Sequence, residues 1–219
     1  MRGKLVKQDP KDQPASELLK EIQAAKERLV KEGKIKQQKE LPPIKPDEVP
    51  YAVPEGWVWT RLGEVGETQT GTTPATKDSD NFGDYIPFIG PGDILNQAIV
   101  YNNNGLSEKG INNSRLIQKY SILMVCIGGS IGKHAINTVD VACNQQINTI
   151  TPFTCDVKFL FYSMWSDDFQ NNVVANAGGS ATPIINKNKW SMILIPLPPL
   201  AEQKRIVAKI DQLMALCDK

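Results

Sequence analysis

The sequence predicts a mixed α/β fold, in which a curved mixed sheet with short helices forms a domain flanked by long coiled-coil helices. Apolar runs in the middle of the chain are short and are separated by clusters of Gly, Asn and Asp, as is typical of strands and turns. Both ends of the chain instead repeat apolar residues every three or four positions, which is the helical period. The 219 residues are enough for one substantial core plus accessory helices.

The first long helix is predicted over residues 14–40. Pro14 suits a first helical turn, whereas Gly33 weakens the second half of the helix. The apolar residues repeat by four, three and four positions, at Leu18, Ile22, Ala25 and Leu29. Residues 41–54 contain five prolines and therefore predict an extended linker instead of more helix.

Five strands and one helical insert are expected between the linker and the second long helix. The insert covers residues 157–174, where aromatic and apolar residues fall near helical spacing and Asp156 is placed to cap the first turn. The expected strands are Ile86–Ile89, Ile99–Tyr101, Ile122–Ile127, Ile147–Thr151 and Met192–Ile195.

The second long helix is predicted over residues 200–219, directly after a proline stop. Its apolar residues Ile206, Ile210, Leu213 and Cys217 step by four, three and four, which is the spacing of a seam that contacts another helix. No Gly or Pro stops the helix before Lys219, so we expect it to continue in a longer natural chain. The two long helices are expected to pair antiparallel, within one chain or between two, through Leu18, Ile22, Leu29, Ile206, Ile210 and Leu213.

The net charge of +1 conceals a division along the chain. Residues 1–50 hold 12 basic and 9 acidic side chains, residues 51–199 hold 9 and 12, and residues 200–219 hold 4 and 3. A protein that grips DNA mainly through phosphates should be basic, so this balance argues mildly against nucleic acid. Residues 112–199, with 6 basic and 4 acidic groups, still leave room for a local positive face.

Cysteine and histidine usage indicates no metal site. The four cysteines lack CxxC spacing and His134 is the single histidine, so neither a zinc site nor another cofactor is expected. The sequence contains no apolar run of 18 residues and no signal-peptide core. These features predict a cytoplasmic protein with reduced thiols.

No pattern of residues supports catalysis. The glycine-rich loop before Lys133 resembles a phosphate-binding P-loop, but Ile127 and His134 stand where that motif requires Gly and Ser or Thr. Asp167 and Asp168 are adjacent in the predicted insert, and adjacent helical residues diverge by about 100°. We therefore expect them to be solvated, and we expect the chain to be non-catalytic.

Several short motifs, in order, carry a family resemblance. They are Gly3-Lys4-Leu5-Val6 with Pro14-Ala15-Ser16-Glu17-Leu18-Leu19, Val53-Pro54-Glu55-Gly56-Trp57, Gly71-Thr72-Thr73-Pro74, Gly129-Ser130-Ile131-Gly132-Lys133, Asn144-Gln145-Gln146-Ile147-Asn148, Gly178–Lys187, and Ile195–Ile210. Together they resemble the DNA-specificity (S) subunits of type I restriction-modification systems. Members usually carry two target-recognition domains and two conserved helices, so this chain resembles half of one.

The resemblance implies a division of the chain and a function. Residues 1–40 would be a conserved helix region, 41–54 a linker, 55–199 a target-recognition domain and 200–219 the start of the second conserved helix. The chain would bind one half of a bipartite target in double-stranded DNA, and would dock modification (methyltransferase) subunits and a restriction subunit. A helix of about 25 residues spans about 37 Å, close to one turn of DNA, so paired helices could set the distance between two recognition domains in a homodimer.

Two other functions remain open from the residues. The chain could be a scaffold that binds protein and no DNA, or a remnant of a restriction or methyltransferase enzyme of another type. The absence of any preference for one duplex over random DNA would favour the scaffold. Binding of a methyl donor would favour the enzyme remnant.

Candidate DNA contacts lie in four loops that combine hydroxyl, amide and lysine side chains, the groups that contact phosphates and base edges. The glycine-rich loop and the Asn-Gln-Gln segment also fit purely structural roles, as a turn after a buried strand and as a buried network. The candidates are Thr72, Thr73, Lys77, Ser130, Lys133, Asn144, Gln145, Gln146, Ser180, Thr182, Lys187 and Lys189.

Overall fold

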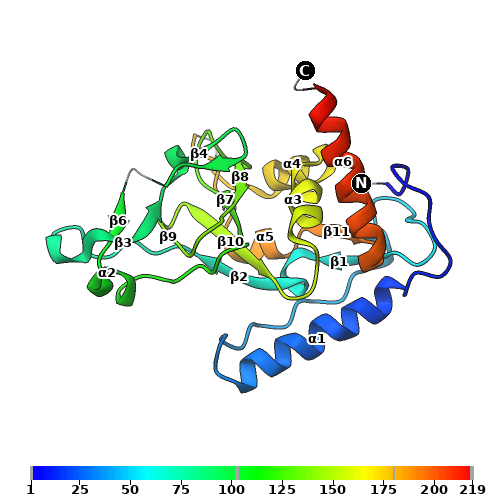
Figure 1. Cartoon of the computed structure of the whole chain (residues 1–219), viewed down its shortest axis with the longest axis horizontal. Coiled ribbons are helices and arrows are strands. Elements are labelled where there is room, and N and C mark those ends of the chain that lie inside the picture. The colour runs from blue at the N-terminus through cyan, green and yellow to red at the C-terminus, as the bar shows by residue number, and fades with distance from the viewer. Residues whose placement is uncertain (1, 102–103, 180, 218–219) are drawn as a thin grey trace. The chain divides into compact units, whose positions relative to one another are not determined.

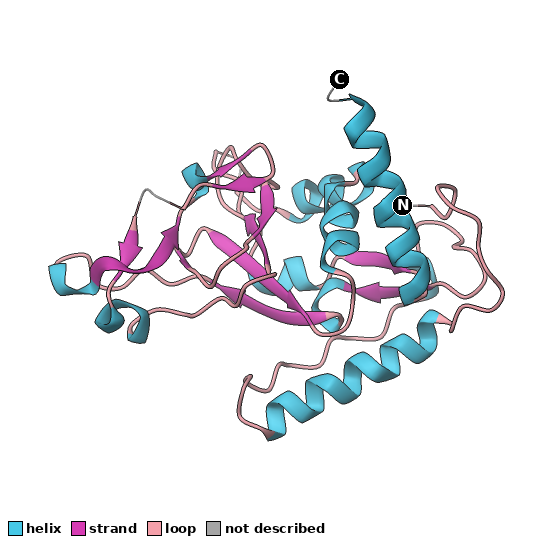
Figure 2. Ribbon diagram, viewed as in Figure 1, coloured by secondary structure: helices cyan, strands magenta, loops and turns pink. Residues whose placement is uncertain are grey.

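A computed structural model describes residues 2–101, 104–179 and 181–217 (Figures 1 and 2). The chain consists of two compact units. The terminal unit is built from both ends of the chain and one middle segment: Met1–Gly66, Pro152–Phe169 and Ser191–Lys219. The central unit comprises Glu67–Thr151 and Gln170–Trp190. The mixed α/β class is confirmed, with strands and helices in both units. The boundaries implied by the family resemblance stay a prediction.

The terminal unit contains a two-stranded sheet and three main helices. Strand β1 pairs antiparallel with β11, in a register that places Val58 opposite Leu197. The elements are α1 (Ala15–Lys31), η1 (Pro46–Glu48), β1 (Val58–Arg61), η2 (Leu62–Glu64), α3 (Val157–Trp165), β11 (Leu194–Leu197) and α6 (Leu200–Cys217). Two further helices cross the division between the units, α4 (Asp167–Asn176) and α5 (Lys187–Ser191).

Helix α1 is shorter than the sequence predicts. It ends at Lys31, and Gly33 follows with a φ of +68°, a left-handed conformation that stops helices and favours glycine. Residues 34–40 are therefore not helical, which corrects the predicted range of 14–40. Leu18 and Ile22 are buried as expected, and Leu29 is half-buried.

Helix α6 begins in a buried junction. The indole nitrogen of Trp57 donates to a carboxylate oxygen of Glu202 at 2.9 Å, and the amide of Gln8 donates to the other oxygen at 3.1 Å. The neighbouring Gln203 donates to the carbonyl of Pro198 at 3.0 Å and accepts from the backbone of Asp156 at 2.9 Å. The motifs at residues 53–57 and 195–210 thus meet in one core.

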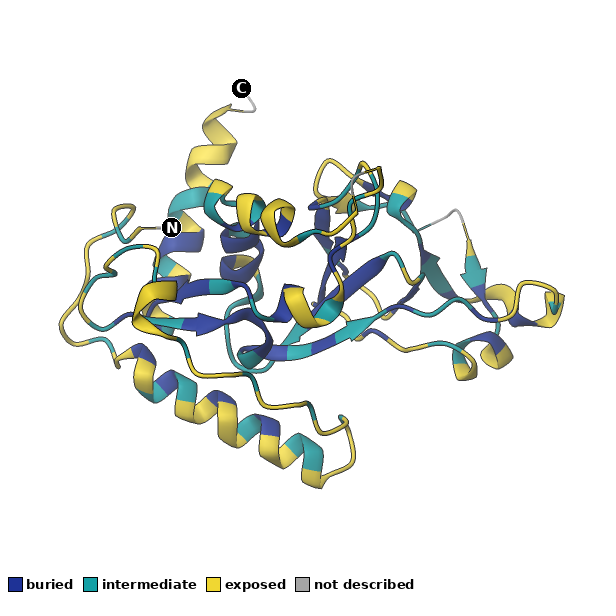
Figure 3. Ribbon diagram, turned by 180° about the vertical axis from the view of Figure 1, so that it is seen from behind, coloured by how far each residue is buried: buried dark blue, intermediate teal, exposed yellow. Residues whose placement is uncertain are grey.

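The predicted seam of α6 is used in two ways. Ile206 is buried in a cluster with Trp57 and Phe159, and Ile210 packs at the edge of that cluster. Leu213 is 41% exposed, and Figure 3 shows the far end of α6 exposed to solvent. Figures 1 and 3 also show α1 and α6 diverging, so the two helices do not pair along their lengths within the chain. Pairing between chains stays a prediction.

The central unit is built around a four-stranded sheet in the order β2-β10-β7-β8, accompanied by a three-stranded sheet β6-β3-β9 and the pair β4-β5. Strand β7 pairs antiparallel with both β10 and β8. The strands are β2 (Gly66–Thr70), β3 (Phe82–Ile89), β4 (Ile94–Leu95), β5 (Ala98–Ile99), β6 (Gly105–Leu106), β7 (Ile122–Val125), β8 (His134–Ile136), β9 (Ala142–Cys143) and β10 (Ile147–Pro152). The short helices are η3 (Ser79–Asn81), η4 (Pro91–Asp93) and α2 (Glu108–Asn112).

The core of the central unit lies between these sheets. Its buried members come from β3, β4, β7, β8, β9, β10 and the loops between them, and β7 is buried at all four positions. The cluster is Ile89, Ile94, Ile117, Leu123, Val125, Ala135, Val141, Cys143 and Ile147. At about 25 cal/mol per Å² of buried apolar surface, such residues supply the main stabilisation of the sheet.

The helical insert is split by a break. Asp156 caps α3, because its carboxylate accepts from the backbone of Phe159 at 3.0 Å, which confirms the predicted cap. Ser166 has extended backbone angles that end α3, and α4 continues to Asn176. Among the described residues, no helix is both long and apolar enough to cross a bilayer.

Candidate nucleic-acid interface

Two of the predicted loops form one surface of the central unit. The segment after β2 lies against the segment after β9, because the backbone of Thr72 donates to the carbonyl of Cys143 at 2.8 Å. The hydroxyl of Thr73 donates to the side-chain oxygen of Gln145 at 2.7 Å. Hydroxyl and amide groups that are 72 positions apart in the sequence are thereby held together.

Gly71 allows this close approach. A Cβ at position 71 would lie 2.2 Å from the carbonyl oxygen of Asn144 and 2.3 Å from that of Cys143. Both neighbours are backbone atoms, which cannot rotate out of the way as a side chain does. Only glycine fits between the two segments, so its place in the Gly-Thr-Thr-Pro motif has a steric cause.

Arg115 joins the same surface and was missed by the sequence predictions. Its Nη1 donates to the carbonyl of Thr70 at 2.6 Å, and the hydroxyl of Ser114 donates to the carbonyl of Thr72. We call the set Thr70–Thr73, Ser114–Arg115 and Asn144–Gln146 the recognition cluster. One signal in the sequence pointed to Arg115: it is the single arginine in residues 67–151 and 170–190.

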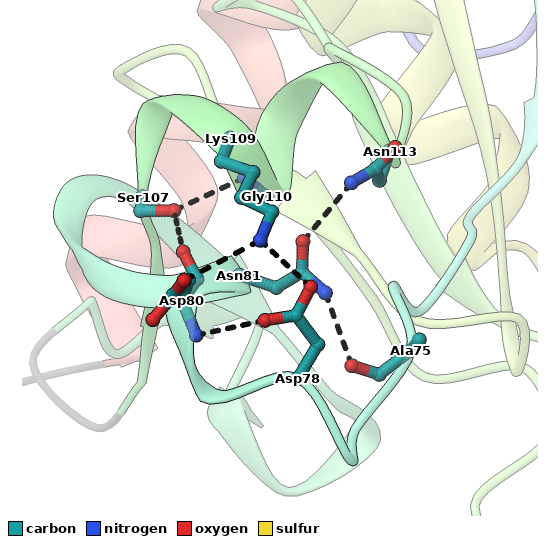
Figure 4. A network of polar contacts seen from close by, with 8 residues as sticks. All are labelled: Ala75, Asp78, Asp80, Asn81, Ser107, Lys109, Gly110 and Asn113. Carbon is teal, nitrogen blue, oxygen red and sulfur yellow. Dashed lines mark hydrogen bonds and ion pairs between the residues drawn. The ribbon is translucent and has the colours of Figure 1, made fainter.

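The loop that continues from the recognition cluster is fastened to α2 (Figure 4). The Nζ of Lys109 lies 2.8 Å from Asp78 and 3.5 Å from Asp80, and it lowers the pKa of Asp78 through a hydrogen bond. Asn81 donates to the carbonyl of Ala75 at 3.1 Å. Lys77 is exposed inside this loop, so a predicted contact residue is presented on a braced segment.

The glycine-rich loop follows β7, and the backbone of Cys126 just before it donates to the carbonyl of Gln146 in the recognition cluster at 2.8 Å. The backbone of Gly128 donates to the carbonyl of Pro183 at 2.9 Å, which joins this loop to the Gly178–Lys187 motif. Lys133 and Thr182 are exposed and Ser130 is half-buried. Ser180, also a predicted contact, lies outside the described residues. Two predicted contacts, Lys133 and Thr182, are thus exposed on the two segments that this bond joins.

Asn148 connects the two groups of loops. It is 2% exposed, accepts from the hydroxyl of Thr70 at 2.8 Å and donates to the carbonyl of Ile185 at 3.4 Å. It also hydrogen-bonds to the thiol of Cys126, whose pKa is raised to about 12 by burial despite that bond. Asn148 lies in β10, so its hydrogen bonds tie both β2 and the 178–187 segment to β10.

The Asn-Gln-Gln segment divides between the two roles that the sequence left open. Asn144 and Gln146 are half-buried and hydrogen-bond to each other twice, at 3.2 Å between side chains and 3.0 Å from the Gln146 backbone. Gln145 between them is exposed. The outer two amides brace the loop, and the middle one faces solvent.

The remaining two predicted lysines are engaged within the chain. Burial raises the pKa of Glu67, and the positive charge of half-buried Lys187 opposes that rise. Lys189 is exposed and donates to the carbonyl of Asn176 at 3.2 Å. Both stay predicted DNA contacts, although Lys189 already uses one of its hydrogen-bond donors within the chain.

The electrostatics of the central unit are balanced. Residues 67–151 and 170–190 hold seven Lys or Arg and seven Asp or Glu. In the part of the chain that the structure describes, no carboxylate lies within ion-pair distance of Lys77, Arg115 or Lys133. This surface therefore offers a few unneutralised cations among neutral amides and hydroxyls, which suits directional hydrogen bonding more than bulk attraction of phosphates.

Comparison with known proteins gives this arrangement a family. The type I restriction modification DNA specificity domain matches residues 54–219. The specificity subunit of the type I restriction enzyme EcoAI of Escherichia coli is 33% identical over 99% of this chain and 38% of its own length. That of EcoEI, also from Escherichia coli, is 31% identical over 99% of this chain and 39% of its own length. The chain thus spans about two fifths of these curated relatives.

Solved structures agree on the fold. The HsdS subunit from Thermoanaerobacter tengcongensis superposes with a TM-score of 0.63 at 20% identity, covering 92% of this chain and 45% of that one. A chain from a structure on complex assembly of the type I R-M system gives a TM-score of 0.64 at 21% identity, covering 92% and 49%. The chain belongs to the family of type I restriction-modification DNA specificity domains.

Proposed function

We propose that this chain is a DNA sequence-recognition subunit of a type I restriction-modification complex and binds one half of a bipartite target. The observation that carries the proposal is the recognition cluster, in which exposed Gln145 and Arg115 and half-buried Thr73 are held by backbone and side-chain hydrogen bonds. Amide, hydroxyl and guanidinium groups read base edges, and rigid positioning is what lets them discriminate. Membership of the specificity-domain family supports the same function.

The predicted contacts take different parts in this proposal. Thr72, Thr73, Asn144, Gln145 and Gln146 would form the base-reading surface or its support. Exposed lysines at 77 and 133, with Ser130, Thr182, Ser180, Lys187 and Lys189, would contact phosphates at the margins. The chain itself would transfer no methyl group and cleave no DNA.

The partners proposed are the modification and restriction subunits, and a second copy of the chain. Leu213, Met214 and Leu216 leave the far end of α6 apolar and exposed, which supports helix pairing there. A two-fold pair of chains would present two inverted half-sites. Sedimentation at tens of micromolar tests this pairing, and a monomer under those conditions would remove it.

Selection of binding sites tests the DNA-recognition proposal. The chain, with and without the modification subunit of the same host, is incubated with random duplexes, and bound DNA is sequenced. We expect one short motif to be enriched, with a preference over random DNA of about a thousandfold or more in the complex. The chain alone should bind weakly, because the central unit carries no net charge to attract phosphates.

The control is the same selection with the modification subunit alone. Enrichment of no motif by the chain, in either state, would favour a protein-binding scaffold. Binding of S-adenosylmethionine by the isolated chain would instead favour the remnant of an enzyme.

A further inference from the structure

We propose that Arg115 and Gln145 together read a guanine through the major groove. The inference rests on the proposed function and deepens it, because it names a base that the target must contain. It follows from an imbalance between hydrogen-bond donors and acceptors in the recognition cluster.

The acceptors of the cluster are engaged within the protein. The carbonyl of Thr70 accepts from Arg115, and the carbonyl of Thr72 accepts from Ser114. The side-chain oxygen of Gln145 accepts from the hydroxyl of Thr73 at 2.7 Å. The side-chain oxygen of Asn144 accepts from the backbone of Gln146 at 3.0 Å. Each of these oxygens therefore already accepts one hydrogen bond within the protein.

The two exposed side chains of the cluster, Arg115 and Gln145, both offer hydrogen-bond donors. The guanidinium of Arg115 has five N–H donors, and one of them, on Nη1, is bonded to the carbonyl of Thr70. Because its oxygen is fixed by Thr73, Gln145 keeps its NH₂ group for a ligand. Neither side chain has another hydrogen-bond partner among the described residues, and both are exposed. The cluster therefore complements a ligand edge that is rich in acceptors.

Guanine is the base whose major-groove edge has that character. It presents two adjacent acceptors, N7 and O6, whereas adenine pairs one acceptor with one donor and cytosine presents a donor. A guanidinium held at one nitrogen by a backbone carbonyl is oriented before binding, which lowers the entropic cost of a two-point contact. The anchored Arg115 and the amide of Gln145 supply donors to both guanine acceptors.

A phosphate also presents acceptors, and two features favour the base. Besides Arg115, the recognition cluster consists of neutral residues, most of them with hydroxyl or amide side chains, and it contains no second cation. The central unit as a whole has equal numbers of acidic and basic groups, so it creates little field for a polyanion.

The experiment uses the complex of chain and modification subunit with its selected duplex. Each guanine of the half-site is replaced in turn by 7-deazaguanine, which lacks the N7 acceptor, or by inosine, which keeps N7 and O6. Arg115→Ala and Arg115→Lys are compared with Lys119→Ala, an exposed cation of the same unit that lies over the Tyr120 ring. Thermal unfolding confirms that each variant is folded.

At one guanine, 7-deazaguanine should weaken binding of the unsubstituted chain about tenfold, and inosine should have little effect. The Arg115→Ala protein should bind the selected duplex about tenfold or more weakly than the unsubstituted chain. Its affinity should no longer change when 7-deazaguanine replaces guanine at that position. Arg115→Lys should recover part of the loss, and Lys119→Ala should keep the full sensitivity to 7-deazaguanine.

Three results would overturn the inference while leaving DNA recognition intact. The first is a selected half-site without guanine, and the second is an Arg115→Ala protein that keeps its sensitivity to 7-deazaguanine. The third is an Arg115→Ala protein whose affinity falls equally on all duplexes, with a salt dependence reduced by about one phosphate contact. Failure of the proposed function is separate, because the unsubstituted complex would then select no motif.

Discussion

Gly71→Ala is expected to abolish sequence discrimination and to destabilise the central unit. The added Cβ would lie 2.2 Å and 2.3 Å from two backbone carbonyl oxygens, so the segments after β2 and β9 must separate. Separation would break the bond from Thr72 to Cys143 and pull Thr73 away from Gln145. Overpacking of this kind costs about 1–3 kcal/mol, and against backbone the upper end is expected. Urea denaturation and binding to the selected duplex measure the two effects.

Gly129→Ala is the matched control. A Cβ at this position meets no atom within 4 Å, and Gly129 is exposed in the glycine-rich loop. The same chemical change should therefore raise stability by about 0.4–1 kcal/mol, because it reduces the conformational entropy of the unfolded chain. Equal effects of the two substitutions on stability and on binding would contradict the steric role assigned to Gly71.

Glu202→Ala is expected to have the second large effect, on the terminal unit. Glu202 is 1% exposed and accepts from the indole of Trp57 and the amide of Gln8. Its removal leaves a buried indole N–H without an acceptor, which costs about 1–3 kcal/mol, and it also opens a small void. We expect a total loss of about 3 kcal/mol in the free energy of unfolding, measured by urea denaturation.

Two further variants make this test specific. Glu202→Gln keeps the size of the side chain and one acceptor oxygen, so it should lose roughly half as much stability. Lys204→Ala, at an exposed position of the same helix, should change stability by less than about 0.5 kcal/mol. A Glu202→Ala protein as stable as Lys204→Ala would show that the junction of Trp57 with α6 does not hold the unit together.

Features with strong local signals were predictable from the sequence. The start of α1 at Ala15 follows Pro14, the cap of α3 is Asp156, and α6 follows the proline stop as expected. Strand β2 was not predicted, because its residues Gly66–Thr70 are polar and lack alternation. Its pairing in the sheet is decided by tertiary contacts that no short window contains.

The same limit explains the outcome at the seam of α6. The step of four and three from Ile206 predicts a helix face that contacts something, but not what it contacts. Ile206 meets Trp57 and Phe159, which are 149 and 47 positions away in sequence. Half of the predicted coiled-coil seam is therefore occupied within the chain, and Leu213 beyond it is exposed.

The candidate site was predictable in its parts and not in its assembly. Thr73 and Gln145 were identified separately from residue type and loop position, yet their hydrogen bond could not be inferred from positions 72 residues apart. Arg115 lies between Ser114 and Leu116 in no motif, and its contact with the Thr70 carbonyl depends on the packing of three loops. Residue types predicted the chemistry, and the fold determined which groups act together.

Lysine footprinting on the DNA complex tests the central claim, that the central unit carries the DNA-binding surface. An amine-reactive reagent is applied to the complex with its selected duplex or with random DNA, and modification is measured by mass spectrometry. Lys77 and Lys133, exposed in the central unit, should be protected on the selected duplex, and exposed Lys20 and Lys204 of the terminal unit should react at an unchanged rate. Protection of Lys20 and Lys204, with Lys77 and Lys133 as reactive as in the free protein, would contradict the account.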